Sequence, residues 1–335
     1  MTEAKPRRTT IYDLSKRLGI SAPTISVVLN GTWQKRRISR ETAEIVLRHA
    51  SKIDYMPNRQ AQSLRGSAGT MVGLLIPTHD SRFFATVARA FEERVRQSGR
   101  CPVVVSAARD PVRERETTKT LISYSIGALV VCGATDPDGV HDICEKFGVP
   151  HVNIDLPGKR AMSIVSDNVL AGTSLTDAVL ERLLAKGELQ AADIHFVGGL
   201  SNLATRDRIK GFKQSMVSRR MKPKADAIQT IGYDAAIAEA NFAALYGQGK
   251  NVPKGLLIDG LPVFEGFCRF ARAHSVAAES VVVGCFDYDP FASFCSFETF
   301  MIRQDARRMV DMAMDALESE NVQAGIHYVT PELVC

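Results

Sequence analysis

The chain has 335 residues, with 42 Lys+Arg against 37 Asp+Glu and a formal net charge of +5. At ~100–200 residues per domain, this length suggests two or three domains. Hydrophobic residues make up 45% and charged residues 24%, which argues against a disordered, collagen-like or coiled-coil chain. No apolar run reaches the ~18–20 residues that a membrane helix needs. The basic N-terminus leads into no apolar segment, so we expect no secretory signal, no membrane contact and a cytoplasmic location.

The positive charge is concentrated at the N-terminal end. Residues 1–69 contain 13 Lys+Arg and 5 Asp+Glu, a net charge of +8, whereas the remaining 266 residues carry a net charge of −3. A basic patch on a small domain is the electrostatic pattern expected of a protein that binds a polyanion. This asymmetry therefore favours a nucleic-acid-binding unit joined to a larger, mildly acidic one.

Seven cysteines are spread along the chain without a metal-binding pattern. None forms a CxxC pair, and none lies near a histidine at metal-ligand spacing. We therefore expect buried, reduced thiols and no metal site. These residues are Cys101, Cys132, Cys144, Cys268, Cys285, Cys295 and Cys335.

The first fifty residues carry the signals of three short helices. Thr10 can cap the first helix, with Asp13 returning the bond three residues later, and Gly19 ends that helix. Ser21 is the N-cap of a second helix and Ser39 precedes a third. Two short helices joined by a tight glycine turn predict a helix-turn-helix. Its small core would contain Ile11, Leu14, Leu18, Ile25, Val28, Leu29, Thr42, Ile45 and Val46.

The second helix of a helix-turn-helix enters the major groove of DNA by its N-terminal end. Ala22, Pro23 and Val27 would then lie nearest the bases. A three-helix module that binds protein, with a solvated basic face, is the alternative. Polar residues around the turn would contact phosphates or brace the turn: Ser21, Thr24, Ser26 and Asn30.

Two segments resemble the LacI/GalR family of bacterial transcription repressors. That family shows TxYDxAxxxGVSxxTVSxxLN and, about 25 residues later, YxPNxxAxxL; here residues 10–30 read TIYDLSKRLGISAPTISVVLN and residues 55–64 read YMPNRQAQSL. The resemblance implies a homodimer that binds a palindromic operator in double-stranded DNA. It also implies a hinge helix near residues 58–65, which is too short to be stable alone.

Within that hinge helix, Leu64 matches the wedge leucine that inserts between base steps in the minor groove, although a core leucine is the alternative. Asn58 and Ala61 match positions at the same groove. The residues that we predict to face DNA are Thr10, Tyr12, Ser21, Ala22, Pro23, Thr24, Ser26, Val27, Asn30, Lys35, Arg36, Arg37, Asn58, Ala61 and Leu64.

The chain departs from the family pattern in two places. Many members carry an arginine where this chain has Val27, so that direct guanine contact is missing. The segment 32–37 is about three residues longer than usual and contains three adjacent cations, Lys35, Arg36 and Arg37. These cations could bind a DNA phosphate or reach a groove of the DNA. The alternative, equally open, is that the segment is only a solvated charged loop.

From residue 70 onward, apolar β-branched runs such as VGLLIP (72–77) and VVVGC (281–285) alternate with helical segments. This alternation predicts parallel sheets covered by helices on both faces. One sheet rarely takes in so many residues, so we expect two similar lobes. The predicted fold class is α/β, with a small all-α helix-turn-helix domain and a two-lobed, doubly wound parallel-sheet core.

The resemblance implies that this core is similar to a periplasmic sugar-binding protein, with three chain crossovers. We expect them near Asp167, near Gln304-Asp305, and after the helix that ends at about Glu320. The chain ends in PELVC without a leucine heptad tail, which favours a dimer over a tetramer. The predicted domains are a helix-turn-helix domain (1–57), a hinge helix and linker (58–69) and a core (70–335), with lobe one at about 70–165 and 305–320 and lobe two at about 166–304 and 321–335.

The family motifs nominate residues that face an effector cleft between the lobes. Asp155 ends the strand HVNID, and Asp287 lies in CFDYD (285–289). Arg208 lies in TRDRIKGF (205–212), where it would either donate two hydrogen bonds to the ligand or form a salt bridge between the lobes. In PTHDSRFF (77–84), Ser81-Arg82 replaces the family's Asn-Pro, while Phe84 could stack on a ligand or only pack. The predicted effector-binding residues are Phe84, Asp155, Asp167, Arg208, Tyr233 and Asp287.

Catalytic signatures are absent, since no strand is followed by GxGxxG and the motifs GxxxxGK[ST], HExxH and GxSxG do not occur. We therefore predict no enzyme and no cofactor. The predicted function is a ligand-responsive repressor of sugar or related carbon-metabolism genes, with a sugar or sugar derivative as effector. A purine or phosphorylated effector, a stand-alone small-molecule binding protein and a sugar- or nucleoside-processing enzyme are the alternatives.

Overall fold

The structure is a computed structural model that describes residues 10–53, 55, 71–247, 252–319 and 323–334. The chain divides into two compact units, residues 1–68 and residues 69–335. The predicted hinge residues Asn58, Ala61 and Leu64 lie outside the described residues. None of the described helices is long and apolar enough to cross a membrane.

The N-terminal unit is a three-helix helix-turn-helix made of α1 (Ile11–Leu18), α2 (Ala22–Leu29) and α3 (Arg40–Lys52). Its helix ends follow the predicted signals. Thr10 and Asp13 form a capping box, and Gly19 adopts a left-handed φ of 64° after α1. The hydroxyl groups of Ser21 and Ser39 accept hydrogen bonds from the third residues of α2 and α3. These local predictions are confirmed.

One prediction for the core of this unit is wrong. Ile45 is 42% exposed, because the inner face of α3 is formed by Ala43, Val46 and Ala50, which recur at helical spacing. Ile45 lies about 100° around the helix from Val46 and therefore points outward. The half-buried ring of Trp33 packs against the core instead.

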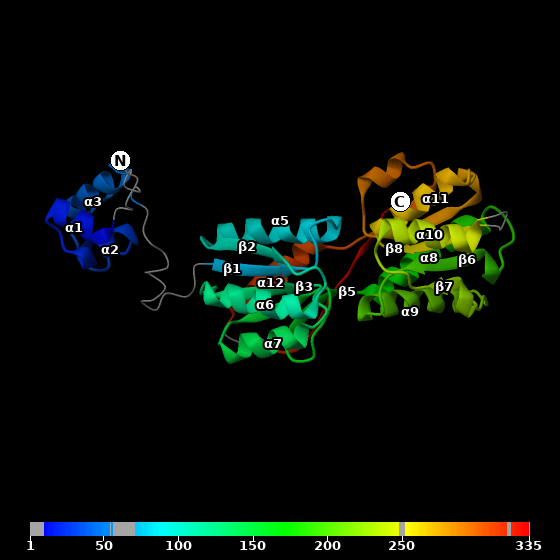
Figure 1. Cartoon of the computed structure of the whole chain (residues 1–335), viewed down its shortest axis with the longest axis horizontal. Helices are drawn as coiled ribbons and strands as arrows, with labels where there is room; N and C mark the ends of the chain where they lie inside the picture. Colours follow the sequence, from blue (N-terminus) through cyan, green and yellow to red (C-terminus); the bar gives the residue numbers. More distant parts are fainter. Residues whose placement is uncertain (1–9, 54, 56–70, 248–251, 320–322, 335) are drawn as a thin grey trace, which may run out of the picture. The chain divides into compact units, whose positions relative to one another are not determined.

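The first sheet of the core is wholly parallel, with the strand order β11-β5-β4-β3-β1-β2 (Figure 1). Helices α5 and α12 cover one face and share one apolar cluster, while α6 and α7 pack on a second cluster at the other face. The strands are β1 (Met71–Ile76), β2 (Cys101–Ser106), β3 (Ala128–Cys132), β4 (His151–Ile154), β5 (Met162–Ser166) and β11 (Gly325–Val329). The helices are α5 (Arg82–Gln97), α6 (Pro111–Ser123), α7 (Pro137–Lys146) and α12 (Ala306–Glu318).

The second sheet repeats this plan with the order β12-β10-β9-β8-β6-β7, in which only β12 is antiparallel. Helices α8 and α9 cover one face, and α10 and α11 cover the other. The strands are β6 (Ile194–Gly198), β7 (Ile228–Gln229), β8 (Gly255–Asp259), β9 (Val282–Phe286), β10 (Glu298–Arg303) and β12 (Glu332–Val334). The helices are α8 (Asn168–Leu184), α9 (Leu203–Ser218), α10 (Ala235–Tyr246) and α11 (Leu261–Ala273), and four 3-10 turns include η4 (Pro290–Phe294).

The chain passes between the two sheets three times. The first two passages lie at Asp167, between β5 and α8, and at Gln304-Asp305, between β10 and α12. The assignment of residues 321–335 to lobe two is wrong for β11, which pairs in parallel with β5 at the edge of the first sheet. The third passage therefore comes later, at Thr330-Pro331, and only β12 joins lobe two. The strand β11 satisfies the backbone groups that β5 would otherwise leave unpaired at a sheet edge.

Candidate functional site

A cavity of about 210 Å³ lies at the carboxyl ends of strands from both sheets. In open α/β sheets, ligands bind in the crevice outside these strand ends, because the loops there carry free side chains. Five of the six residues predicted to bind the effector meet in this cavity. Its lining comprises Thr78, Asp80, Ser81, Phe83, Phe84, Arg109, Asp155, Asn202, Ala204, Arg208, Tyr233, Pro262, Asp287 and Gln304.

The exception is Asp167, which is not among these lining residues. Its carboxylate accepts a hydrogen bond of 2.9 Å from the backbone N–H of Leu170 and caps the N-terminus of α8. A carboxylate placed this way satisfies an unpaired donor of the helix. Asp167 therefore has a structural task at the crossover, and the structure does not place it with the other predicted effector residues.

Arg208 is the centre of a buried polar network in lobe two. Its Nη1 donates to Asp259 Oδ1 at 2.5 Å and its Nε donates to Asn168 Oδ1 at 2.8 Å. Its guanidinium carbon lies 4.5 Å from the ring centroid of Phe286. Burial acts to lower the pKa of Arg208, but the facing carboxylate of Asp259 outweighs it and raises that pKa. Arg208 is thus held charged by a partner within its own lobe, and this ion pair is not an interlobe salt bridge.

Asp259 completes the network from the end of β8. The Thr205 hydroxyl donates to its Oδ2 at 2.8 Å, and the Tyr233 hydroxyl donates to the same oxygen at 3.3 Å. Burial, followed by the neighbouring Asp259 charge, raises the pKa of Tyr233, so this hydroxyl stays a donor. Gly199, with φ 82°, follows β6 beside this carboxylate, and an added Cβ would collide with Asp259 and Thr205. The glycines of VGGLSN therefore allow the loop to approach the network closely.

Two further carboxylates face the cavity from opposite lobes. Asp155 follows β4 and Asp287 follows β9, and both adopt left-handed backbone conformations with φ of 74° and 69°. Such strain costs about 1–3 kcal/mol per residue and is concentrated at functional sites. Burial raises the pKa of Asp155 to about 6, although Arg208 and Arg109 act to lower it. Burial also raises the pKa of Asp287, which Arg208 and a 2.7 Å hydrogen bond from Gln304 partly counteract.

Arg109 spans the cavity and was not predicted from the sequence. Its guanidinium carbon lies 5.5 Å from the ring centroid of Phe84 in lobe one and 5.4 Å from that of Tyr233 in lobe two. Both contacts are of the cation–π type. Phe84 is only 4% exposed and packs edge-on against Phe83, so its ring contributes to the core and to the cavity wall.

Arg109 and Asp259 could have been found with the rule that identified Asp155. Arg109 comes three residues after the end of β2, and Asp259 is the last residue of β8. Both therefore lie at carboxyl ends of strands that form from apolar runs, PVVVSA (102–107) and LLID (256–259). Asn202 and Gln304 are harder to find, because one is a helix cap and the other lies at a crossover.

The predicted DNA-facing surface of the N-terminal unit is exposed in part. Tyr12 is 69% exposed, Pro23 is exposed, and Ala22 and Val27 are half-buried. The Ser21 and Thr24 hydroxyls are hydrogen-bonded to each other at 2.8 Å, so this pair braces the turn. The Thr10 hydroxyl donates to Asp13 in the same way.

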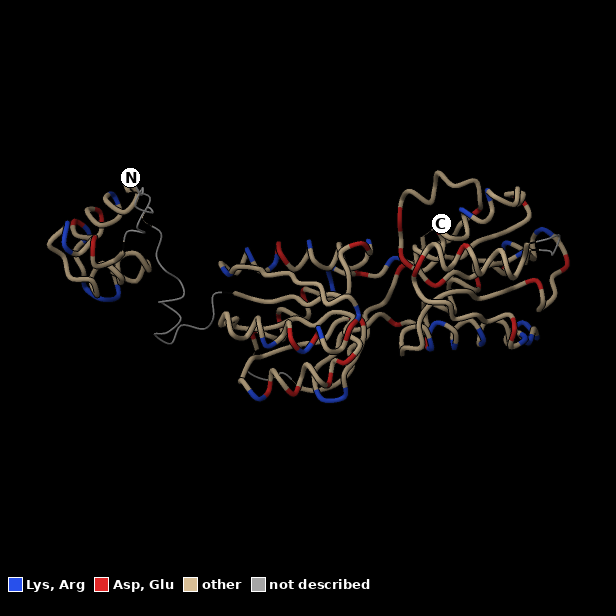
Figure 2. The backbone as a smooth tube through the Cα atoms, in the orientation of Figure 1, with Lys and Arg blue, Asp and Glu red and all other residues tan. Residues whose placement is uncertain are grey.

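The longer segment after α2 forms a turn anchored by Trp33. The backbone N–H of Ile38 donates to the Trp33 carbonyl at 3.1 Å, and Arg37 has a φ of 56°. Lys35, Arg36 and Arg37 are exposed and form no ion pair with another described residue. Figure 2 shows that basic positions are spread over this three-helix unit.

Comparisons with known proteins give concordant relatives, although a scan against protein-family models found no match. The ribitol operon repressor of Klebsiella aerogenes is 41% identical over 194 residues, which covers 58% of this chain and 71% of that protein. The sucrose operon repressor of Klebsiella pneumoniae is 26% identical over 316 residues, which covers 93% of this chain and 92% of that protein.

Among solved structures, the Lac repressor bound to ONPG in the repressed state has a TM-score of 0.81 at 22% identity. The match covers 98% of this chain and 99% of the Lac repressor chain. This likeness confirms the predicted fold class. The identity to the ribitol operon repressor over most of its length decides the family. The chain belongs to the LacI/GalR family of bacterial transcriptional repressors, a family of regulators and not of enzymes.

Proposed function

We propose that the chain is an operon repressor that binds its operator as a homodimer and responds to an uncharged linear polyol of the pentitol class. The observation that carries this proposal is the cavity between the lobes, in which carboxylates and guanidinium groups converge from the loops after β1, β2, β4 and β9 and from α9. A polyol offers a hydroxyl on every carbon, and each hydroxyl both donates and accepts a hydrogen bond.

The charge of the cavity favours a neutral ligand over a phosphorylated one. Asp80, Asp155 and Asp287 line it against two guanidinium groups, and one of these, Arg208, is already paired with Asp259. An added phosphate would face more carboxylate than free cation, and like charges repel strongly in a partly desolvated site. Hydroxyl groups can instead donate to the carboxylates and accept from Arg109 and Arg208.

The size of the cavity supports a small ligand. Its volume of about 210 Å³ is below the roughly 300–1,000 Å³ that is typical of sites for drug-sized molecules. The name of the relative that is 41% identical refers to a ribitol operon, which also supports a pentitol. Ribitol is therefore the first compound to test.

DNA recognition is assigned to residues 1–69, which carry a net charge of +8. Ala22, Pro23 and Val27 would face bases through apolar contacts, while Lys35, Arg36 and Arg37 would contact phosphates. The hinge residues, including Leu64, keep their proposed place in the minor groove. A ligand that binds the two lobe arrangements unequally would change the affinity of the dimer for DNA.

Calorimetry with the full chain tests the effector class. Ribitol, xylitol and D-arabinitol should bind, whereas ribose 5-phosphate and hypoxanthine should not. A DNA ligand selected from a random pool should then be released, or bound more tightly, when the same pentitol is added. Binding of only the phosphorylated sugar or the purine would refute the polyol assignment and leave the repressor assignment standing. Absence of any specific DNA ligand would refute the repressor function itself.

A further inference from the structure

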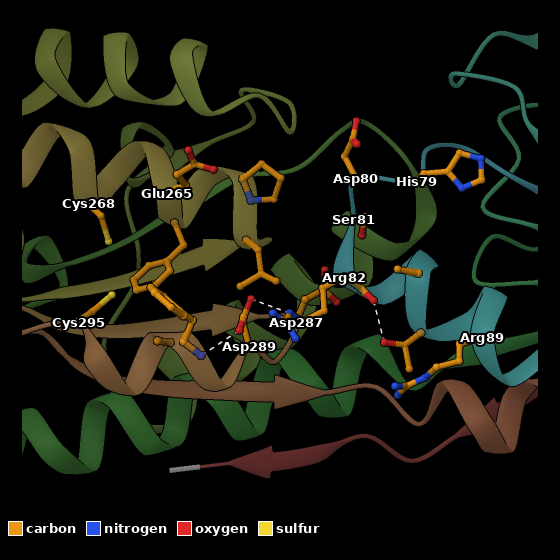
Figure 3. A pocket seen from close by; sticks show the side chains of 17 residues that line it. His79, Asp80, Ser81, Arg82, Arg89, Glu265, Cys268, Asp287, Asp289 and Cys295 are labelled. Atoms are coloured by element: carbon orange, nitrogen blue, oxygen red, sulfur yellow. Dashed lines mark hydrogen bonds and ion pairs between the residues drawn. The ribbon is translucent and has the colours of Figure 1, made fainter.

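Two cysteine side chains lie side by side in lobe two, outside the effector cavity. Cys268 belongs to α11, and Cys295 comes directly after η4. Both line a groove of about 870 Å³, and both pack against the same apolar cluster. In Figure 3 their sulfur atoms are turned toward each other across the space between the two segments.

This pair differs from the other described cysteines. Cys132, Cys144 and Cys285 are buried, and buried thiols in apolar surroundings are unreactive. Cys101 is exposed, and no described cysteine lies beside it at the edge strand β2. The expectation of buried thiols is therefore wrong for Cys101, which is exposed, and for Cys268 and Cys295, which are half-buried. Among the six described cysteines, only Cys268 and Cys295 combine partial exposure with a neighbouring thiol.

A metal site is a poor explanation for the two thiols. Within the described parts of the chain, no three His, Cys, Asp or Glu side chains form a group that could hold a metal ion. A structural zinc site needs four ligands, and a catalytic one usually has three. Two adjacent thiols without further ligands are instead suited to disulfide chemistry.

We propose that Cys268 and Cys295 are a redox-active pair that hydrogen peroxide converts into a disulfide and that a dithiol reduces back to two thiols. The Cys295 thiolate attacks the peroxide, the O–O bond breaks, and a sulfenic acid and one water form after protonation. The Cys268 sulfur then attacks the sulfenic sulfur, the S–O bond breaks, and its oxygen leaves as a second water with the proton of Cys268. The two sulfur atoms lose two electrons in total, which reduce the peroxide.

The position of Cys295 connects this chemistry to the effector cavity. The η4 turn is capped by Asp289, whose Oδ2 lies 2.6 Å from Arg82 Nε in lobe one. Asp287 lies two residues before that cap and faces the cavity. A disulfide would covalently link α11 to the η4 segment, which is preceded by Asp289 of the interlobe ion pair and by Asp287 of the cavity lining. We therefore expect oxidation to change effector affinity, and this part rests on the proposed polyol function.

The surroundings of Cys268 make the reaction slow at neutral pH. Burial, with a further contribution from the adjacent Cys295, raises the pKa of Cys268 to about 12. Because the thiolate is the attacking species, disulfide formation should accelerate as the pH rises from 7 to 9. A slow closure suits a response to sustained oxidation.

The first test needs no effector. The full chain is treated with hydrogen peroxide, alkylated, digested without reductant and analysed by mass spectrometry. We expect a crosslinked peptide pair containing Cys268 and Cys295, which dithiothreitol separates and which Cys295→Ser and Cys268→Ser both lack. Cys101→Ser is the matched control and should form the crosslink as the wild type does. Overoxidised cysteines or intermolecular disulfides in place of this crosslink would overturn the proposal.

The second test measures ribitol affinity before and after oxidation. We expect a change of at least about fivefold in the wild type, the lower end of typical coupling between two sites, and none in Cys295→Ser. A crosslinked protein with unchanged ribitol affinity would overturn the coupling. If the reduced protein does not bind ribitol, the polyol assignment fails. The mass-spectrometric search for the crosslinked peptides then still decides whether the disulfide forms.

Discussion

Removal of Arg208 should destabilise the protein as well as impair recognition. The side chain of Arg208 is 5% exposed and that of Asp259 is fully buried. Among the described residues, Arg208→Ala would leave this carboxylate with only the hydroxyls of Thr205 and Tyr233 as side-chain donors. Removing one partner of a buried ion pair costs about 3–5 kcal/mol, because an uncompensated charge remains in the interior. For a domain of this size, that loss corresponds to a decrease of roughly 6–20 °C in Tm.

A double variant separates the ion pair from the loss of packing. Arg208→Met combined with Asp259→Asn removes both charges and keeps an acceptor for the hydroxyls of Thr205 and Tyr233. Its Tm should therefore decrease by less than half of the decrease caused by Arg208→Ala. Thermal unfolding of the full chains at pH 7.5 without effector measures both. If Arg208→Ala is as stable as the wild type, or if the double variant is as unstable as the single one, the buried charge does not control stability.

The double variant also isolates the recognition role of Arg208. Its Nη2 has no acceptor among the described residues, so this N–H is available to a ligand in the cavity. Loss of one charge-assisted hydrogen bond costs about 1.5–3 kcal/mol, or roughly 10–150-fold in affinity. The folded double variant should therefore bind ribitol at least tenfold more weakly in calorimetry. Wild-type affinity in that variant would remove Arg208 from the site.

Three further predictions concern other charged groups. Because burial raises the pKa of Asp155 to about 6, ribitol affinity should fall as the pH drops from 7.5 to 5.5 and this carboxylate becomes protonated, and Asp155→Asn should remove this pH dependence. Ionisation of Asp155 in the wild type should also lower the free energy of unfolding as the pH rises from about 4 to 6, which urea titrations measure. Arg82→Ala and Asp289→Ala should each weaken ribitol binding by up to about fivefold, since this ion pair is worth at most about 1 kcal/mol. The double variant should bind ribitol no more weakly than either single variant, and additive losses would contradict the pairing. Arg36→Ala should lower the slope of log affinity for DNA against log salt by about 0.9, whereas Arg40, which pairs with Glu44, serves as a control whose removal should leave the slope unchanged.

The parts of the structure that local rules determine were predictable from the sequence. The caps at Thr10, Ser21 and Ser39 depend on a few adjacent residues, and so do the strands that end just before Asp155 and Asp287. Ligands of open α/β sheets bind at the carboxyl ends of the strands, and the family motifs HVNID and CFDYD assign these two carboxylates, which belong to different sheets, to one cleft between the lobes.

The remaining features depend on tertiary packing. The pairing of β11 with β5 joins residues far apart in the sequence, and nothing local distinguishes it from a strand of the other sheet. The same holds for Arg109, whose role comes from rings in both lobes, and for the buried pair of Arg208 with Asp259. Ile45 was misplaced because Ile45 and Val46 are adjacent apolar residues, and the sequence alone leaves open which of the two lies on the buried face of α3.

The two halves of the cavity between the lobes differ in how far they are organised in advance. In lobe two, Arg208, Asp259 and Tyr233 are fixed by hydrogen bonds to one another, so a ligand would meet them with little reorganisation. In lobe one, Asp155 has a raised pKa and a strained backbone, so its charge lacks comparable support. Ligand hydroxyls can supply that support only when the lobes are close together. A polyol would then bind the closed arrangement more tightly than the open one, and this difference in affinity is the only source of energy from which it can shift the conformation of the core.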